Sequence, residues 1–144
     1  MTISKLNPDT VHRTAGYSHV TISSAGRLAH LAGQCPLDRS GSVVGEPGDH
    51  AAQTAQVIAN CLAVLSAAGA TPGDVVRSVI YVVSPDSRVL SAVWEQLNTS
   101  ELAPAFSTAS TLLGVASLGY PGQLVEVDLT AALPAEPEGP PPSR

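Results

Sequence analysis

Residues 49–83 constrain the fold more than any other stretch, because they predict a helix, a turn and a strand in direct succession. Apolar side chains recur there at helical spacing and form one stripe, made of Val57, Ile58, Cys61, Leu62, Leu65 and Ala68. Asp49 is a good N-cap for this helix, and Gly69 is its natural C-cap. After the turn at 71–74, residues 75–83 are β-branched and nearly all apolar, which predicts a strand buried on both faces.

Further elements are predicted on either side of this unit. Residues 19–23 and 27–33 are apolar runs that flank a short turn, and they predict a β-hairpin. Residues 84–86 open a second, weaker helix that runs through Leu97, and residues 106–115 predict another strand.

The clearest strand lies at residues 123–132, where apolar and polar side chains alternate: Val125, Val127, Leu129 and Ala131 against Glu126, Asp128 and Thr130. The element order β-β-α-β-α-β-β predicts an α+β domain with both helices on one side of the sheet. The other face would carry Glu126 and Asp128 and would need a cover. Association through that face is the simplest solution.

Length and composition predict one domain. The chain has 144 residues, 44% of them apolar, which is enough for a single core over residues 1–133. Residues 134–144 contain five prolines and two glutamates, so we expect a disordered tail there. The charged fraction is only 13%, which is easiest to explain if another subunit covers part of the surface.

Charge and hydropathy exclude several classes of partner. A net charge of −5 with scattered basic residues argues against nucleic acid. No apolar run approaches the roughly 20 residues that span a bilayer, and the N-terminus has no signal-peptide pattern. We therefore expect a cytoplasmic protein with no membrane partner, and Cys35 and Cys61 as thiols.

Four segments resemble one known family. They are GYSHV at 16–20, LAGQCPLD at 31–38, the helix-turn-strand unit at 51–82, and TASTLLGVASLGYPGQLVEVDLTA at 108–131. The chain is similar, over roughly residues 6–133, to the reactive-intermediate deaminases (Rid, YjgF-like, endoribonuclease L-PSP). The resemblance implies a chorismate-mutase-like fold with a mixed sheet and a homotrimer packed as a central barrel. It also implies small-molecule sites in the clefts between subunits, where enamines and imines are hydrolysed to 2-keto acids and ammonia.

One position departs from the family pattern. The family carries an arginine just before the last signature strand, and the matching residue here is Ser110. Arginine clamps a substrate carboxylate through two parallel charged hydrogen bonds, each worth on the order of 1.5–3 kcal/mol. Of the other arginines, Arg27 and Arg77 fit surface or interface positions better than the pocket. The sequence therefore predicts weak or absent activity on 2-imino acids.

By the same resemblance, five residues line the cleft. Glu126 matches the acidic residue that positions water, and it is either a general base or a carboxylate held for structural reasons. Tyr17 could stack on a planar substrate or donate a hydrogen bond; otherwise it is an interface residue. Ser110 could bond a neutral oxygen or merely fill space. Backbone groups near Ala32 and Leu112 complete the wall.

No cofactor is implied, and no spacing of Cys, His or Asp predicts a metal site. His19 and His30 are expected to be packed or surface residues. Cys35 is expected to be a buried thiol, since no base for it can be identified from the sequence. Three functions stay open: an imine or enamine hydrolase, a non-catalytic metabolite-binding trimer, and an interaction protein with a vestigial cleft.

Overall fold

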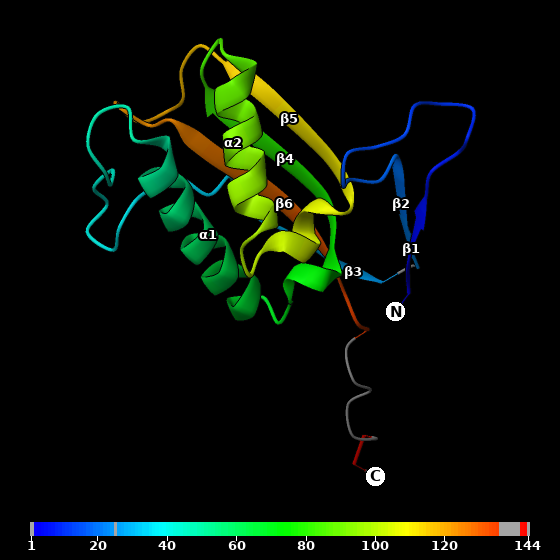
Figure 1. The fold of residues 1–144 in the computed structure, drawn as a ribbon. Coiled ribbons are helices and arrows are strands. Elements are labelled where there is room, and N and C mark those ends of the chain that lie inside the picture. The colour runs from blue at the N-terminus through cyan, green and yellow to red at the C-terminus, as the bar shows by residue number, and fades with distance from the viewer. Residues whose placement is uncertain (1, 25, 136–141, 144) are drawn as a thin grey trace.

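Four strands form one mixed sheet, and both helices pack on the same face of it (Figure 1). The computed structural model describes residues 2–24, 26–135 and 142–143. Its elements are β1 (Ile3–Leu6), β2 (Val20–Ser23), β3 (Arg27–His30), α1 (His50–Ala67), β4 (Val75–Val83), α2 (Ser87–Asn98), β5 (Ala109–Val115) and β6 (Val125–Leu133). The sheet order is β3-β6-β4-β5, with only β4 and β5 parallel. The predicted α+β class, with two helices on one face of a mixed sheet, is confirmed.

Helix α1 begins and ends where the sequence predicts. The Asp49 carboxylate accepts a hydrogen bond from the backbone N–H of Ala52 at 2.9 Å. At the other end, Gly69 has φ +80°, and the N–H of Ala70 donates to the carbonyl of Leu65 at 2.9 Å. This is the Schellman arrangement, which places the glycine one residue beyond the cap. The apolar stripe faces the sheet, with Val57, Cys61 and Leu65 buried.

Strands β4 and β6 carry the core on one face only. Ile80, Val82 and Val127 are fully buried toward the helices, whereas Tyr81 and Glu126, which pair across the other face, are half-buried. The composition of β4 predicts a strand that is buried on both faces. Within one chain, however, only one face of β4 is buried. A β-bulge lies between Val75 and Arg77 and shifts the register of β4 against β6.

The predicted N-terminal hairpin is wrong. Strand β2 pairs antiparallel with β1, whereas β3 pairs antiparallel with β6. The pattern of β1 was missed because this strand is short and mostly exposed, so it has no apolar periodicity to detect. The small β1–β2 sheet is tied to the start of β5, because the backbone N–H of Ala109 donates to Thr21 Oγ1 at 2.8 Å.

One further boundary differs from the expectation. The strand predicted from residue 106 begins at Ala109, because Ala103–Phe106 form a 3-10 turn that inserts the Phe106 ring into the core. Most of the predicted tail, residues 136–141 and 144, lies outside the described residues.

Candidate functional site

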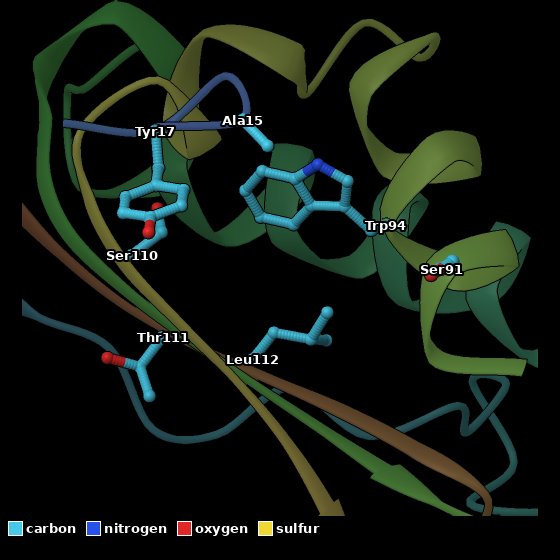
Figure 2. A pocket seen from close by; sticks show the side chains of 7 residues that line it. All are labelled: Ala15, Tyr17, Ser91, Trp94, Ser110, Thr111 and Leu112. Carbon is cyan, nitrogen blue, oxygen red and sulfur yellow. The ribbon is translucent and has the colours of Figure 1, made fainter. Parts of the chain in front are cut away.

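A cavity of about 410 Å³ opens at the edge of the sheet, between β5, α2 and the loop that precedes β2. Its lining residues are Ala15, Tyr17, Ser91, Trp94, Ser110, Thr111 and Leu112 (Figure 2). None of these side chains is charged. We call this cavity the edge pocket. Its walls suit a ligand that offers a flat surface and a few hydrogen-bonding groups.

Two aromatic rings form the hydrophobic wall of the edge pocket. The Tyr17 and Trp94 rings meet edge to face, with centroids 6.4 Å apart and planes at 82°. Trp94 is anchored in turn by the buried Phe106 ring, at 6.1 Å. Because α2 and the core fix Trp94, the loop-borne Tyr17 gains a rigid partner.

Ser110 enters the edge pocket with its hydroxyl already bonded. Its Oγ donates to the carbonyl oxygen of Phe106 at 3.0 Å and is also hydrogen-bonded to Ser78 Oγ. A hydroxyl has a single proton, so Ser78 acts as the donor when Ser110 donates to Phe106. Ser110 then has no free proton for a ligand and offers at most a lone pair.

Arg77 lies close to this position in the sheet but on the other face. Its Nη2 donates to Thr111 Oγ1 at 3.0 Å and its Nη1 to the carbonyl of Ala109 at 3.3 Å, so the guanidinium is held by the two neighbours of Ser110. Arg77 does not line the edge pocket. The cation that the family pattern places at residue 110 is therefore not restored from β4 within one chain.

Glu126 belongs to a second cluster. Its Oε1 accepts hydrogen bonds from Cys35 Sγ at 3.1 Å and from Gln123 Nε2 at 3.2 Å. Its carboxylate also closes on Gly33, where a Cβ would lie 2.5 Å from Oε2. We call Gly33, Cys35, Gln123 and Glu126 the thiol–carboxylate cluster.

Burial raises the pKa of the Cys35 thiol to about 11, and the hydrogen bond to Glu126 and its negative charge add to this effect. The Glu126 carboxylate is thus a hydrogen-bond partner of Cys35 that the sequence did not reveal. At neutral pH, however, it keeps the thiol protonated. The second thiol, Cys61, lies in the core, and burial raises its pKa to about 12.

The structure brings together three of the five predicted site residues. Tyr17, Ser110 and Leu112 line the edge pocket. Glu126 pairs with Tyr81 on the open face of the sheet, whereas Ser110 pairs with Ser78 on the helix-covered face. Ala32 is not among the lining residues either; its carbonyl accepts from the Gln34 side chain at 3.0 Å. A site that joins Glu126 to Ser110 needs a second chain and stays a prediction.

Several lining residues have no signature in the sequence that marks them as part of a site. Trp94 and Ser91 lie on α2, which was predicted only as a weak helix, and Ala15 and Thr111 have no chemical signature of their own. The one available signal was that Trp94 is the single tryptophan of the chain. Among the described residues, no group of three or more His, Cys, Asp or Glu could hold a metal ion.

Within the described part of the chain, no helix has the length and hydropathy needed to cross a bilayer.

Known structures resemble this chain over nearly its whole length. The YyfB protein of the conserved Rid family from Yersinia pestis is 37% identical, with a TM-score of 0.79, and the alignment covers 92% of this chain and all of that one. The family member Rv2704 from Mycobacterium tuberculosis, of the YjgF/YER057c/UK114 family, is 27% identical with a TM-score of 0.55 over 92% of this chain and all of that one.

A shorter match is found among curated sequences. RutC family protein PH0854 of Pyrococcus horikoshii is 41% identical over 59 residues, which is 40% of this chain. The matched stretch spans 45% of that relative, so less than half of its length is covered. The model of the family described as Endoribonuclease L-PSP matches residues 8–133. With that match and its Rid and YjgF structural neighbours, the chain belongs to the Endoribonuclease L-PSP family.

Proposed function

We propose that this protein takes a small, planar, uncharged metabolite into the edge pocket, and that hydrolysis of an imine or enamine is its reaction. The observation that carries this proposal is the neutral lining of the pocket at the position where the family pattern has an arginine. A ligand carboxylate would lose water there without gaining a cation, which costs several kcal/mol unless it is compensated. A 2-imino acid is therefore expected to be a poor substrate.

The hydrolysis needs a water and a base. Water adds to the carbon of the protonated imine and passes one proton to a carboxylate. The resulting carboxylic acid gives that proton to the nitrogen of the tetrahedral adduct, whose hydroxyl proton is lost as the C–N bond breaks, so that ammonia and a carbonyl compound are released. Glu126 is the proposed base. Since it lies on the face opposite Ser110, we propose that the neighbouring chain supplies it, in a homotrimer whose barrel covers the open face.

The open face supports this assembly. It leaves Leu28, on edge strand β3, 50% exposed and Leu113, which pairs with the half-buried Tyr81 on edge strand β5, 41% exposed. Large apolar side chains exposed on a sheet face favour association. We expect a solution mass of three chains by light scattering at micromolar concentration. A monomer under those conditions contradicts the shared site.

Non-catalytic binding of a metabolite is the second candidate, and one observation favours it. Oε1 of Glu126 already accepts two hydrogen bonds, from Cys35 and Gln123, which is also what a structural carboxylate would do. RNA is not proposed as a ligand, because 12 acidic residues outnumber 7 basic ones and the pocket offers no cation to a phosphate.

The test compares benzamide with benzoate, which have nearly the same shape and differ in charge. Trp94 lines the pocket and is the only tryptophan, so its fluorescence reports binding directly. We expect the native protein to bind benzamide more tightly than benzoate. Ser110→Arg should reverse the order and improve benzoate binding on the order of tenfold or more, the value of one charge-assisted hydrogen bond.

Ser110→Gln is the matched control, since it adds length and hydrogen-bonding groups without charge. Equal binding of benzoate and benzamide by the native protein would show that the pocket is not selective for neutral ligands. Ammonia release from freshly generated 2-aminoacrylate then separates the two candidates. We expect slow release by the native protein and faster release by Ser110→Arg. If Ser110→Arg binds benzoate but releases no ammonia, the binding module is the better description.

A further inference from the structure

Two histidines that the proposed chemistry does not use, His12 and His19, lie against Tyr17, which lines the edge pocket. The hydroxyl of Tyr17 lies 2.9 Å from Nε2 of His12, and the two rings have centroids 6.5 Å apart. His19 stacks edge to face on His12 at 4.7 Å, and its Nε2 is 2.8 Å from the His12 carbonyl oxygen. His12 itself is exposed, so solvent protons reach it freely.

The His12–Tyr17 hydrogen bond can run in two directions. A phenol hydroxyl has one proton to donate and lone pairs to accept with, and a neutral imidazole nitrogen without a proton is a good acceptor. When His12 is neutral with its proton on Nδ1, Nε2 accepts from the Tyr17 hydroxyl, and only the oxygen lone pair of Tyr17 remains for a ligand. When His12 is protonated, Nε2–H must donate, and the hydroxyl proton of Tyr17 is then free to turn toward the pocket.

We infer that His12 is a positioning residue that sets the hydrogen-bond polarity of Tyr17 in the edge pocket. Neutral His12 with its proton on Nδ1 makes the pocket select ligands with an N–H donor, such as enamines and amines. Protonated His12 makes it select ligands with an acceptor, such as ketones and other carbonyl compounds. The inference rests on the proposed function, because it assumes that the edge pocket takes planar neutral ligands. It adds that substrate and carbonyl product are preferred at different protonation states of one exposed histidine.

Few other charges face this hydrogen bond. His19 is the second titratable ring in contact with His12, and Asp9 and Arg13 lie with His12 around a neighbouring surface cavity. From α2 and β5, the groups that line the edge pocket are Ser91, Trp94, Ser110, Thr111 and Leu112, none of which titrates in the relevant range. A pH effect on the ligand preference should therefore depend on His12, with His19 as the competitor to exclude.

Two probes of opposite polarity test the inference: aniline, which offers an N–H donor, and acetophenone, which offers only an acceptor. Binding is followed by the indole N–H signal of Trp94 in ¹H–¹⁵N spectra at about pH 8 and about pH 6, within the range where histidine changes charge. We expect the ratio of acetophenone to aniline affinity to rise about three- to tenfold at the lower pH, the effect of one neutral hydrogen bond.

Three variants show whether the change of the affinity ratio with pH depends on His12 and Tyr17 or on His19. His12→Phe keeps an aromatic ring but has no Nε2, and its affinity ratio should not change with pH. Tyr17→Phe should abolish the change as well, whereas His19→Gln should retain it. If His12→Phe keeps the native pH response, or if both probes bind the native protein with a constant ratio, the inference is wrong and the proposed function stands. If neither probe shifts the Trp94 signal at either pH, the edge pocket does not take planar neutral ligands, and both proposals fall.

Discussion

The two faces of the sheet differ in what completes them. On the face toward α1 and α2, the side chains of β4 and β6 are buried by elements of the same chain, and Ile80 and Val127 have no exposed surface. On the open face, Glu126, Tyr81 and Leu113 remain partly accessible. The first face accounts for the stability of the chain. The open face still has accessible side chains that could contact a ligand or a partner.

The chemistry of the two regions differs in the same way. The edge pocket, on the helix side, is neutral and aromatic, and its Ser110 hydroxyl is committed to the backbone. The thiol–carboxylate cluster on the open face holds a negative charge next to a protonated sulfur. One face therefore offers a surface for recognition without charge, and the other offers a proton acceptor. A hydrolase would need both, which is the physical reason for proposing that two chains share a site.

The largest difference between the two faces should appear in the free energy of unfolding when an apolar and an acidic residue are substituted at adjacent positions on β6. Val127→Asp puts a carboxylate into a fully buried position without a partner, and we expect the free energy of unfolding to fall by at least about 4 kcal/mol. Asp128→Val changes the half-buried neighbour and should alter stability by less than about 1 kcal/mol. Urea titration measures both. Similar losses in the two variants would show that the open face is as tightly packed as the helix side.

Substitution of two glycines, Gly114 and Gly33, tests the same comparison with smaller expected losses of stability. A Cβ on Gly114 would lie 2.7 Å from the backbone oxygen of Ser84, which cannot move without shifting the chain that leads into α2. A Cβ on Gly33 would lie 2.5 Å from Glu126 Oε2, the end of a flexible side chain. We expect Gly114→Ala to cost about 1–3 kcal/mol and Gly33→Ala less than about 1 kcal/mol. Thermal unfolding of both variants should show this order, and a reversed order would contradict it.

The smallest expected effect concerns the reactivity of the Cys35 thiol. Since the pKa of Cys35 is about 11, its thiolate is scarce at pH 8 and alkylation by iodoacetamide should be slow. Glu126→Gln removes the charge that helps to raise this pKa, so alkylation should become faster, by about tenfold for each unit that the pKa falls. Burial, the largest cause, stays in place.

Mass spectrometry locates the label on Cys35, and Cys35→Ala serves as the blank. Buried Cys61 should stay unlabelled in the folded protein. Gly33→Ala should accelerate labelling too, because it pushes the same carboxylate away from the sulfur. Unchanged rates in both variants would mean that Glu126 does not control the thiol in solution.

Local patterns made much of the fold predictable. The Asp49 cap, the Gly69 terminus and the alternation along β6 each depend on side chains within a few residues of one another, and all three are found where expected. Strand partners were less predictable, since pairing depends on which distant strand offers the better surface. The predicted hairpin failed for this reason: β3 pairs with β6, about a hundred residues further along the chain.

The candidate site shows the same limit. Tyr17, Ser110 and Leu112 could be named from the family resemblance, and they do line one pocket. The contact between Cys35 and Glu126 joins residues 91 positions apart, and the Tyr17–His12 bond depends on the path of an irregular loop. Neither has a periodic signature, so only the three-dimensional arrangement reveals them.

The bulge at the start of β4 decides which set of β4 side chains becomes interior. Strict alternation from buried Val75 would turn Arg77, Val79 and Tyr81 inward, and Ser78, Ile80 and Val82 outward. The extra residue, Val76, reverses this parity, so that Arg77 pairs with Thr130 outside and Ile80 packs inside. The side chains on both faces of β4 are largely apolar, so hydrophobicity alone gives little preference for which face is turned toward the core. A single inserted valine thus keeps a guanidinium out of the core and orients the whole strand.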